Sequence, residues 1–356
     1  MEIRKNVVII QAWDSDEGHR TSKNLIQELD KGIYTDLVVV SPQEYEVNWK
    51  VNINASAKEL EAALVKNNVM CTIIYGSYDK VLLQQHQDPV LNTSIIYMPL
   101  FFAYSVANET QSEYGLYRDI PELPIEKVAI SLSNKPHKHR CHAMEALGKN
   151  RILPHMHYSW IETSDQYQEK YPFLSFDDKV KYISDDFRGK LCSSITPGVE
   201  VLKAAFEIVL ESTNNGSFFT EKTFNAIARE RPFLIISRPG ENKLLEQFGF
   251  KSIIDELGLT HVEESWEHLF KNTQETKKNK SYIFEIIHQL SLKLESNYQD
   301  PTGLYNELKP IAEFNRKRLK HIYENRLYFP IALTHLLQRT KLTLEDINVA
   351  HIFEQQ

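Results

Sequence analysis

Thr220, Glu221 and Lys222 form a short polar group that could bind a phosphate and a sugar side by side. Thr220 is suited to cap the N-terminus of a helix, where unpaired N–H groups and the helix dipole attract anions. Lys222 would add a full positive charge for a phosphate. Glu221 would repel phosphate, so we expect it to bind ribose hydroxyls instead. The same residues also suit a helix start with a solvated lysine, so a second group must separate the two interpretations.

The sequence around this group predicts a strand, a turn, a short helix and a second strand. Residues 206–213 are rich in β-forming side chains, and residues 233–236 are apolar enough for a buried strand. Between these runs, apolar residues recur at the spacing of one helix face. The polar group therefore lies beyond the carboxyl end of a predicted strand, and Glu211 lies near the end of that same strand.

A second group of polar residues follows another predicted strand, at residues 126–132. Lys135, Lys138 and Arg140 come close together there, and Asn134 could hold the loop through bonds between its side chain and the backbone. The fork of Arg140 suits phosphate oxygens better than a lysine does. A solvated basic loop is the alternative interpretation. Two such corners in one sheet predict that both face the same ligand.

Histidines gather in the stretch after this second group, which opens a different interpretation. Imidazole is a common metal ligand, so the cluster could build a metal-dependent hydrolase or phosphotransferase. Lys138 and Arg140 lie among these histidines and would repel a cation, and no CxxC pair accompanies them. We therefore predict no metal site, while the alternative rests on His137, His139, His142, His155 and His157.

The elements that must position these residues alternate between β-rich runs and helical patterns. This alternation predicts an α/β protein with parallel sheets covered on both faces. The predicted strands are residues 6–13, 35–41, 69–75, 94–102, 126–132, 206–213 and 233–236, and the predicted helices include 57–66, 78–87 and 243–248. In such sheets ligands bind beyond the carboxyl ends of the strands.

A polar stretch with prolines, residues 111–123, is predicted to link two domains. We expect an N-terminal α/β domain on the acceptor side at residues 1–122. A C-terminal α/β domain on the donor side is expected at residues 123–300. Residues 301–356 have a mostly helical pattern and are expected to pack back across both domains. The predicted architecture is therefore two Rossmann-like domains facing each other across a cleft, with a helical C-terminal segment.

The composition is that of a water-soluble globular protein. Of the 356 residues, 42% are hydrophobic and 25% are charged, which is enough for two cores of ordinary size. The formal net charge is −7 and no basic block is expected, which argues mildly against non-specific binding of a polyanion. The 3 cysteines suggest a reducing compartment. No signal peptide or apolar run of about 20 residues is present, so we expect a cytoplasmic protein without membrane insertion.

The two polar groups together resemble the donor-binding half of a glycosyltransferase of the GT-B fold. The segment Thr220-Glu-Lys-Thr-Phe-Asn-Ala226 is similar to the Glu-Lys donor motif of the α-1,3-fucosyltransferase family. Asn134 with Arg140 resembles an upstream segment of that family. Together with Ser159-Trp160 and Glu211, these residues look closer still to viral and bacteriophage glycosyltransferases. The resemblance covers roughly residues 126–266 and does not reach the predicted N-terminal domain.

The resemblance implies roles for individual residues of the donor site. Arg140 and Lys222 would hold the diphosphate of a nucleoside diphosphate sugar, and Glu221 would hold the ribose. Glu211 would lie near the donor sugar or orient Lys222. Thr220 and Asn134 complete the donor-binding set, and no cofactor is expected besides the nucleotide sugar as co-substrate.

The activity that follows is transfer of the sugar to an acceptor hydroxyl, with inversion and without a metal. The acceptor would be a glycan, with a modified base in DNA as a further candidate. By position in the first predicted loop, Asp14 or Asp16 would act as the general base, although both would also suit a helix cap. A non-catalytic module that binds nucleotide sugars is a third interpretation of the same residues.

Overall fold

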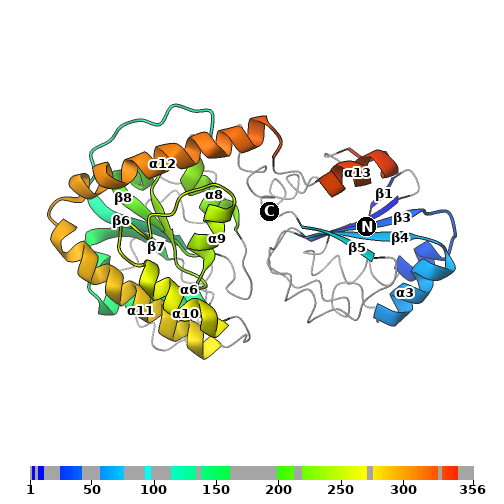
Figure 1. Ribbon diagram of the computed structural model, residues 1–356, viewed down its shortest axis with the longest axis horizontal. Helices are drawn as coiled ribbons and strands as arrows, with labels where there is room; N and C mark the ends of the chain where they lie inside the picture. Colours follow the sequence, from blue (N-terminus) through cyan, green and yellow to red (C-terminus); the bar gives the residue numbers. More distant parts are fainter. Residues whose placement is uncertain are drawn as a thin grey trace. The chain divides into compact units, whose positions relative to one another are not determined.

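The computed structural model describes most of the chain, and every structural statement here concerns those residues. They are residues 2–4, 7–11, 25–41, 57–75, 93–97, 114–133, 138–160, 199–211, 219–270, 276–327 and 331–343. The chain divides into two compact units (Figure 1). The first comprises residues 1–101 together with 326–356, and the second comprises residues 102–325.

This division differs from the predicted one, because the boundary lies near residue 101 rather than 122. Within the predicted linker, Tyr114 and Leu116 are buried in the second unit. Arg316 donates to the carbonyl oxygen of Leu116 at 3.1 Å, which ties the segment down. The polar composition of residues 111–123 predicts a linker, because these contacts involve only a few residues and a partner far along the chain. At the other end, residues 301–325 belong to the second unit and residues 326–356 return to the first.

The first unit is built on a 5-stranded sheet in the order β1-β2-β3-β4-β5. β1 pairs antiparallel with β2, and all other neighbours are parallel. The strands are β1 (Glu2–Arg4), β2 (Val7–Gln11), β3 (Asp36–Ser41), β4 (Met70–Tyr75) and β5 (Thr93–Tyr97), and the helices include α3 (Ala57–Lys66) and α13 (Ile331–Thr340).

The core of the first unit forms where α3 packs on the sheet. Leu60 and Leu64 of α3 meet Leu37 of β3 and Ile73 of β4, and all are fully buried. The helix presents these leucines because they recur at i and i+4. At the rim, Arg339 of α13 pairs with Asp36 at 2.7 Å, which fixes the returning C-terminal segment to β3.

The second unit contains a 4-stranded, fully parallel sheet in the order β7-β6-β8-β9. Its strands are β6 (Lys127–Ser133), β7 (Met156–Trp160), β8 (Ala204–Val209) and β9 (Phe233–Ile235). From β6 the chain moves to one side, to β7, and from β8 it moves to the other side, to β9. The topological switch point, where such sheets bind ligands, therefore lies between β6 and β8.

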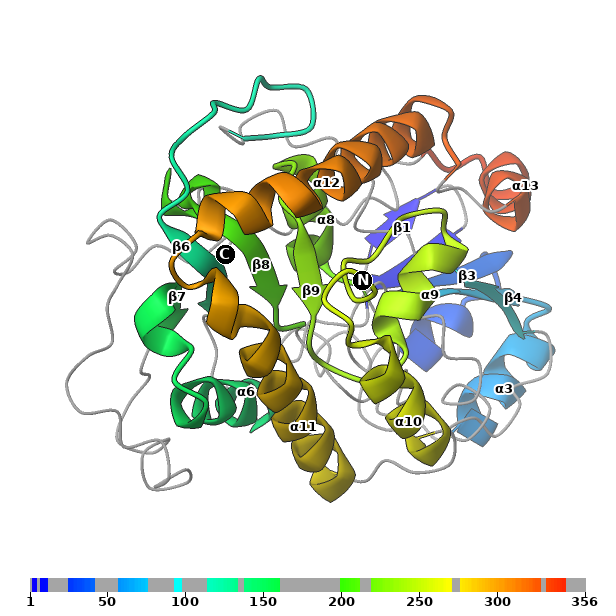
Figure 2. The same ribbon diagram turned by 60° about the vertical axis from the view of Figure 1, so that its left-hand side comes forward.

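Helices cover both faces of this sheet. The view in Figure 2 shows α12 along one face and α11 with α6 along the other. The helices are α6 (Lys138–Lys149), α8 (Glu221–Ala228), α9 (Glu241–Gln247), α10 (Thr260–Phe270), α11 (Thr276–Leu294) and α12 (Pro301–Glu324), with short 3-10 helices at Leu153–His155, Val199–Lys203 and Glu295–Asn297.

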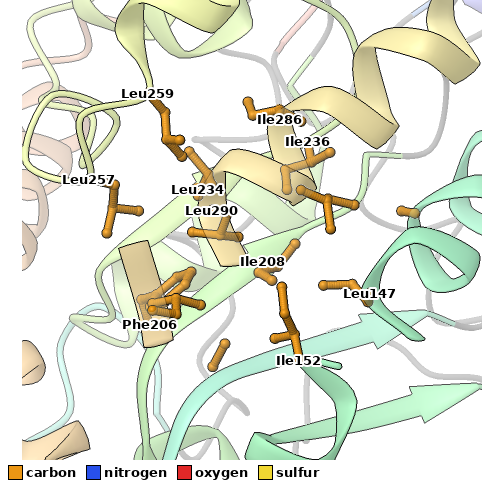
Figure 3. Close-up of a cluster of buried hydrophobic side chains, with 14 of the residues drawn as sticks. Leu147, Ile152, Phe206, Ile208, Leu234, Ile236, Leu257, Leu259, Ile286 and Leu290 are labelled. Atoms are coloured by element: carbon orange, nitrogen blue, oxygen red, sulfur yellow. The ribbon is translucent and has the colours of Figure 1, made fainter. Parts of the chain in front are cut away.

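The core of the second unit lies between β8, α6 and α11. Every residue of β8 is buried, as expected for a central strand covered on both faces. Phe206 and Ile208 of β8 pack with Leu147 of α6 and with Ile286 and Leu290 of α11 (Figure 3). Burying such side chains stabilises the fold by roughly 1.5–3 kcal/mol each, so the strand that leads to the switch point is held rigidly.

Asn242 closes the outer side of β9. Ile236 donates back to Val209 of β8 at 3.0 Å, so the N–H and C=O groups of Ile235 face away from the sheet. The Asn242 side chain accepts from Ile235 N at 3.1 Å and donates to Ile235 O at 2.9 Å. It also donates to Glu263 at 3.0 Å. One amide thus joins β9, α9 and α10.

The α/β class and the parallel sheets are confirmed. Strands lie in all the predicted ranges, helices lie at 57–66 and within 243–248, and Gly249 ends α9 with φ of 81°. The helix predicted at residues 78–87 and the end of the strand predicted at 94–102 lie outside the described residues. Among the helices that the structure describes, none is both long and apolar enough to cross a bilayer.

Candidate functional site

The first turns of α6 and α8 meet at the switch-point edge of the second sheet. α6 begins at Lys138, after β6, and α8 begins at Glu221, after β8. Right-handed crossovers that run in opposite directions place the two helices on opposite faces of the sheet. Their N-terminal turns still reach the same edge, because both follow the carboxyl ends of neighbouring strands. Glu211, just beyond β8, lies where they meet.

The Glu211 carboxylate holds the start of α8. It accepts from Thr220 N at 3.0 Å and from Thr223 Oγ1 at 2.5 Å, and it forms a short hydrogen bond with Thr220 Oγ1. Glu211 is fully buried, as are Thr220 and Thr223. Neutral hydroxyl and amide donors therefore satisfy this carboxylate, and they fix the helix N-terminus against the end of β8.

The backbone carbonyl of Glu211 holds the start of α6. Arg140 Nε donates to Glu211 O at 3.2 Å, and His139 Nε2 lies 2.7 Å from the same oxygen. Arg140 is only 2% exposed. Its charge thus lies beneath the edge of the sheet. Glu211 joins both helix starts through different atoms, which brings together the two polar groups that the sequence predicted to converge.

Lys222 and Glu221 form the exposed part of the site. Thr220 caps α8 as predicted, because its Oγ1 accepts from Lys222 N at 3.2 Å. Lys222 Nζ lies 2.7 Å from Glu221 Oε1, and the two side chains remain 21% and 25% exposed. A cation, a carboxylate and a helix N-terminus are therefore presented to solvent within one turn. This arrangement can receive an anion and a hydroxyl-bearing group together.

Both cations act on the Glu221 carboxylate. Burial alone would raise the pKa of Glu221, but the pair with Lys222 and the charge of Arg140 together hold that pKa below its ordinary value. Glu221 is thus kept ionised, and a carboxylate in this state only accepts hydrogen bonds. The influence of Arg140 also locates its guanidinium charge close to the exposed pair. The carboxylate of Glu221 is therefore acted on by one cation from each helix start, Lys222 of α8 and Arg140 of α6.

Buried carboxyl groups lie behind this edge. Burial raises the pKa of Glu211, against the opposing effects of Lys222, Thr220 and Thr223. Burial and the neighbouring Glu211 raise the pKa of Glu241 well above its ordinary value. Burial likewise raises the pKa of Glu263 to about 7, although Asn242 donates to it. Burial at this end of the sheet therefore favours the protonated form of all three carboxyl groups.

Arg238 is a site candidate that the sequence reasoning missed. It follows β9, whose carboxyl end lies on the same edge as that of β8. Its backbone N donates to Glu241 Oε2 at 3.2 Å, and its charge opposes the rise in the pKa of Glu241. The run Ser237-Arg-Pro-Gly240 directly after the predicted strand at 233–236 was the available signal. It adds a third cation to the edge.

Some predicted site residues lie outside the described part of the chain. Asn134, together with Lys135 and His137, falls in the segment between β6 and α6. Asp14 and Asp16 fall after β2. Their roles stay predictions.

The described histidines have separate surroundings. His139 contacts Glu211 O, and His142 Nδ1 lies 4.0 Å from Glu145 Oε2. His155 stacks on Tyr298 with 3.9 Å between ring centroids. Burial and Lys127 lower the pKa of His157. Within the part of the chain that the structure describes, no three His, Cys, Asp or Glu side chains gather so as to hold a metal ion.

Comparison with known proteins adds no family to this description. Neither the models of known protein families nor the curated proteins include a match to this chain.

Proposed function

We propose that the protein is a glycosyltransferase that uses a nucleoside diphosphate sugar. The observation that carries this proposal is the meeting of two helix starts on Glu211 at the switch point of a parallel sheet. Parallel sheets bind nucleotides at such points. Arg140 and Lys222 bring positive charge to the same edge, as a diphosphate requires. The GT-B arrangement of the two units belongs to this proposal.

The exposed residues would contact the donor directly. Lys222 and the first turn of α8 bind the diphosphate, and Glu221 accepts from the ribose hydroxyls. Arg140 is buried, so it acts by fixing the Glu211 carbonyl and by adding positive potential. Arg238 supplies charge from the end of β9. Glu211 and Thr220 set the position of Lys222, because they determine where α8 begins.

The proposed reaction is an inverting displacement at the anomeric carbon of the donor sugar. The acceptor hydroxyl oxygen forms the new bond to that carbon while the bond to the diphosphate oxygen breaks. The hydroxyl proton passes to a base on the first unit, for which Asp14 and Asp16 are the candidates. The electron pair leaves with the diphosphate, where Lys222 and the helix start stabilise the added negative charge. These side chains supply the charge without a metal.

A thermal-shift screen tests donor binding. The purified chain is heated with UDP-, GDP- and ADP-linked sugars, and with a CMP-linked sugar as a matched monophosphate control. A ligand at 100 times its Kd stabilises the folded state by about 2.7 kcal/mol. We expect one diphosphate donor to raise the Tm and the CMP-linked sugar to leave it unchanged. Absence of a shift with every diphosphate donor would contradict the proposal.

The Lys222→Ala variant tests the assigned site. We expect its Kd for the donor to rise at least tenfold, which corresponds to about 1.4 kcal/mol. Its free energy of unfolding should stay within about 0.5 kcal/mol of wild type, because the side chain is partly exposed. Lys243→Ala, which removes an exposed lysine paired with Glu264, is the control and should bind normally. Donor affinity equal to wild type in Lys222→Ala would remove the assigned role.

Consumption of the donor separates an enzyme from a binding module. The wild-type chain is incubated with the identified donor and with glycan or DNA acceptors, and release of the nucleoside diphosphate is followed. Release that depends on the acceptor supports transfer. Binding without release under every condition would leave only the nucleotide-sugar module.

A further inference from the structure

The outward side of α12 combines positive charge with exposed aromatic rings. We call this surface the α12 basic face and define it by Tyr117, Arg118, Lys251, Phe314, Lys317 and Lys320. Tyr117 is 51% exposed and Phe314 is 40% exposed, although rings of this size are usually buried. The lysines and Arg118 are exposed as well. All of these residues belong to the second unit.

One flank of the face is fixed to α12 by backbone hydrogen bonds. Asn315 accepts from Lys251 N at 2.7 Å and donates to Lys251 O at 2.8 Å. Arg318 donates to Phe248 O at 3.2 Å and 3.0 Å through two nitrogens. Lys251 Nζ then lies 4.6 Å from the centroid of the Phe314 ring. The hydrogen bonds from Asn315 therefore hold the backbone of Lys251 next to α12, at a position from which its side chain reaches the Phe314 ring.

The other flank is fixed in the same way. Arg316 donates to Leu116 O at 3.1 Å and pairs with Glu230 at 3.2 Å. This anchors the segment that carries Tyr117, whose ring centroid lies 5.0 Å from Lys320 Nζ. Tyr117 also meets Tyr323 edge to face, with 6.0 Å between centroids. Each flank thus presents a cation next to an aromatic ring.

The charge of this face departs from that of the whole chain. The formal net charge is −7, yet Arg316, Lys317, Arg318 and Lys320 follow one another closely on α12. The expectation of no basic block is wrong for this helix. The two arginines are used to anchor the flanks, whereas Lys317 and Lys320 point outward. Glu324 lies 4.0 Å from Lys320 and offsets part of its charge, so the positive charge of the face rests mainly on Lys317, Arg118 and Lys251.

We propose that the α12 basic face binds a single strand of nucleic acid. Cations spaced along a helix suit the phosphates of such a strand, whose charge dominates its affinity for proteins. Exposed rings between cations suit unstacked bases, because every base can stack on an aromatic side chain. A duplex hides the faces of its bases, so it could not cover the exposed parts of Tyr117 and Phe314. This proposal goes beyond the donor site and uses none of its residues.

Fluorescence anisotropy with a labelled strand tests the proposal. The probe is a DNA oligomer of mixed sequence, roughly 12 nucleotides long, titrated with the full chain between about 50 and 200 mM salt. We expect Lys317→Ala/Lys320→Ala to weaken binding about tenfold or more at the lower salt concentration. The slope of log affinity against log salt should decrease by about 1.4, because two phosphate contacts are lost.

Matched variants separate this face from general charge. Lys149→Ala/Lys243→Ala removes the same number of positive charges from exposed positions elsewhere in the second unit, and it should bind like wild type. Tyr117→Leu keeps an apolar side chain but removes the ring. We expect it to weaken binding of the strand about fivefold or more, with the salt slope unchanged.

Several outcomes would overturn the proposal. One is that the wild-type chain fails to bind the strand at the lower salt concentration. Another is equal loss in the two double-lysine variants. A third is equal affinity for the strand, for its duplex and for a sulfated polysaccharide, with Tyr117→Leu unaffected. That result would leave a general anion-attracting surface in place of a nucleic-acid site.

Discussion

Strand β8 leads to two buried glutamates whose surroundings differ. Glu207, within the strand, has its carboxylate paired with Arg229 at 2.9 Å, and both side chains are about 5% exposed or less. Glu211, beyond the end of the strand, has its carboxylate bound by Thr220 and Thr223. The arginine at that end goes to the backbone carbonyl instead. One glutamate is paired with a cation, and the other is hydrogen-bonded to neutral donors.

The difference shows that one strand carries a structural ion pair and leads to the candidate site. At Glu207 the opposite charges cancel each other inside the protein, so little field remains outside. At Glu211 the carboxylate is hydrogen-bonded by Thr220 and Thr223, while Lys222 forms its ion pair with Glu221 nearer the surface. Lys222 remains 21% exposed, and Arg140 contributes to the potential felt by Glu221. The end of the strand therefore brings a cation to the surface within an ion pair, and the proposed anion site depends on this cation.

The largest expected effect comes from breaking the interior pair. Glu207→Ala leaves the buried guanidinium of Arg229 without its carboxylate, so we expect the free energy of unfolding to fall by about 3–5 kcal/mol. Urea denaturation followed by circular dichroism measures it. Glu207→Leu/Arg229→Met is the control, and it should recover much of the loss because apolar side chains can replace such a pair. A loss below about 0.5 kcal/mol in Glu207→Ala would show that the buried guanidinium of Arg229 does not depend on the Glu207 carboxylate.

A smaller effect concerns the protonated carboxyls behind the edge. The pKa of Glu263 rises from 4.5 to about 7 in the folded protein. Between these values the folded state keeps a proton that the unfolded chain releases, so the free energy of unfolding falls as pH rises. The contribution of this group is on the order of 3 kcal/mol. It is fully present below the lower value and lost above the higher one.

Glu263→Gln isolates this pH dependence. The amide oxygen can still accept from Asn242, but it does not titrate. We expect the difference in unfolding free energy between wild type and Glu263→Gln to change by that amount between the two pH values. Denaturation at several pH values measures it. Parallel pH curves for the two proteins would show that Glu263 titrates normally.

The smallest effect concerns the cap that holds Lys222 in place. Thr220→Ala removes the oxygen that accepts from Lys222 N and the hydroxyl that donates to Glu211, so we expect a loss of about 1–3 kcal/mol in stability. Thr220→Ser keeps the hydroxyl and should restore most of it. The donor Kd, measured by calorimetry, should rise in Thr220→Ala and recover in Thr220→Ser. A stability loss without any change in donor binding would separate the cap from recognition.

The sequence predicted those features that depend on neighbouring residues. The Thr220 cap and the helix at 57–66 follow from local spacing, and both are confirmed. The basic group that includes Lys138 is predicted as a loop, whereas α6 already begins at Lys138. Lys138 to Arg140 are helical, held by the Glu211 carbonyl, which lies far along the chain.

The features that the sequence did not predict depend on contacts between residues far apart in the chain, which no local pattern indicates. Glu211 was expected near the donor sugar or as a partner that orients Lys222. Its bonds to the starts of two helices required the order of the strands. Tyr114 and Leu116 looked like parts of a linker because their anchor, Arg316, is distant in sequence. Arg238 was overlooked because a single arginine after a strand has no motif of its own.

Asn242 has a consequence for the behaviour of the protein at high concentration. Its amide occupies the N–H and C=O groups of Ile235 on the outer side of β9. Unpaired groups at this position would form a template for the backbone of another molecule and so begin aggregation. The Asn242 side chain makes the two hydrogen bonds to Ile235 that a neighbouring strand would otherwise make. Among the residues that the structure describes, the sheet ends at β9, and Asn242 removes one pair of backbone groups through which copies of the chain could associate.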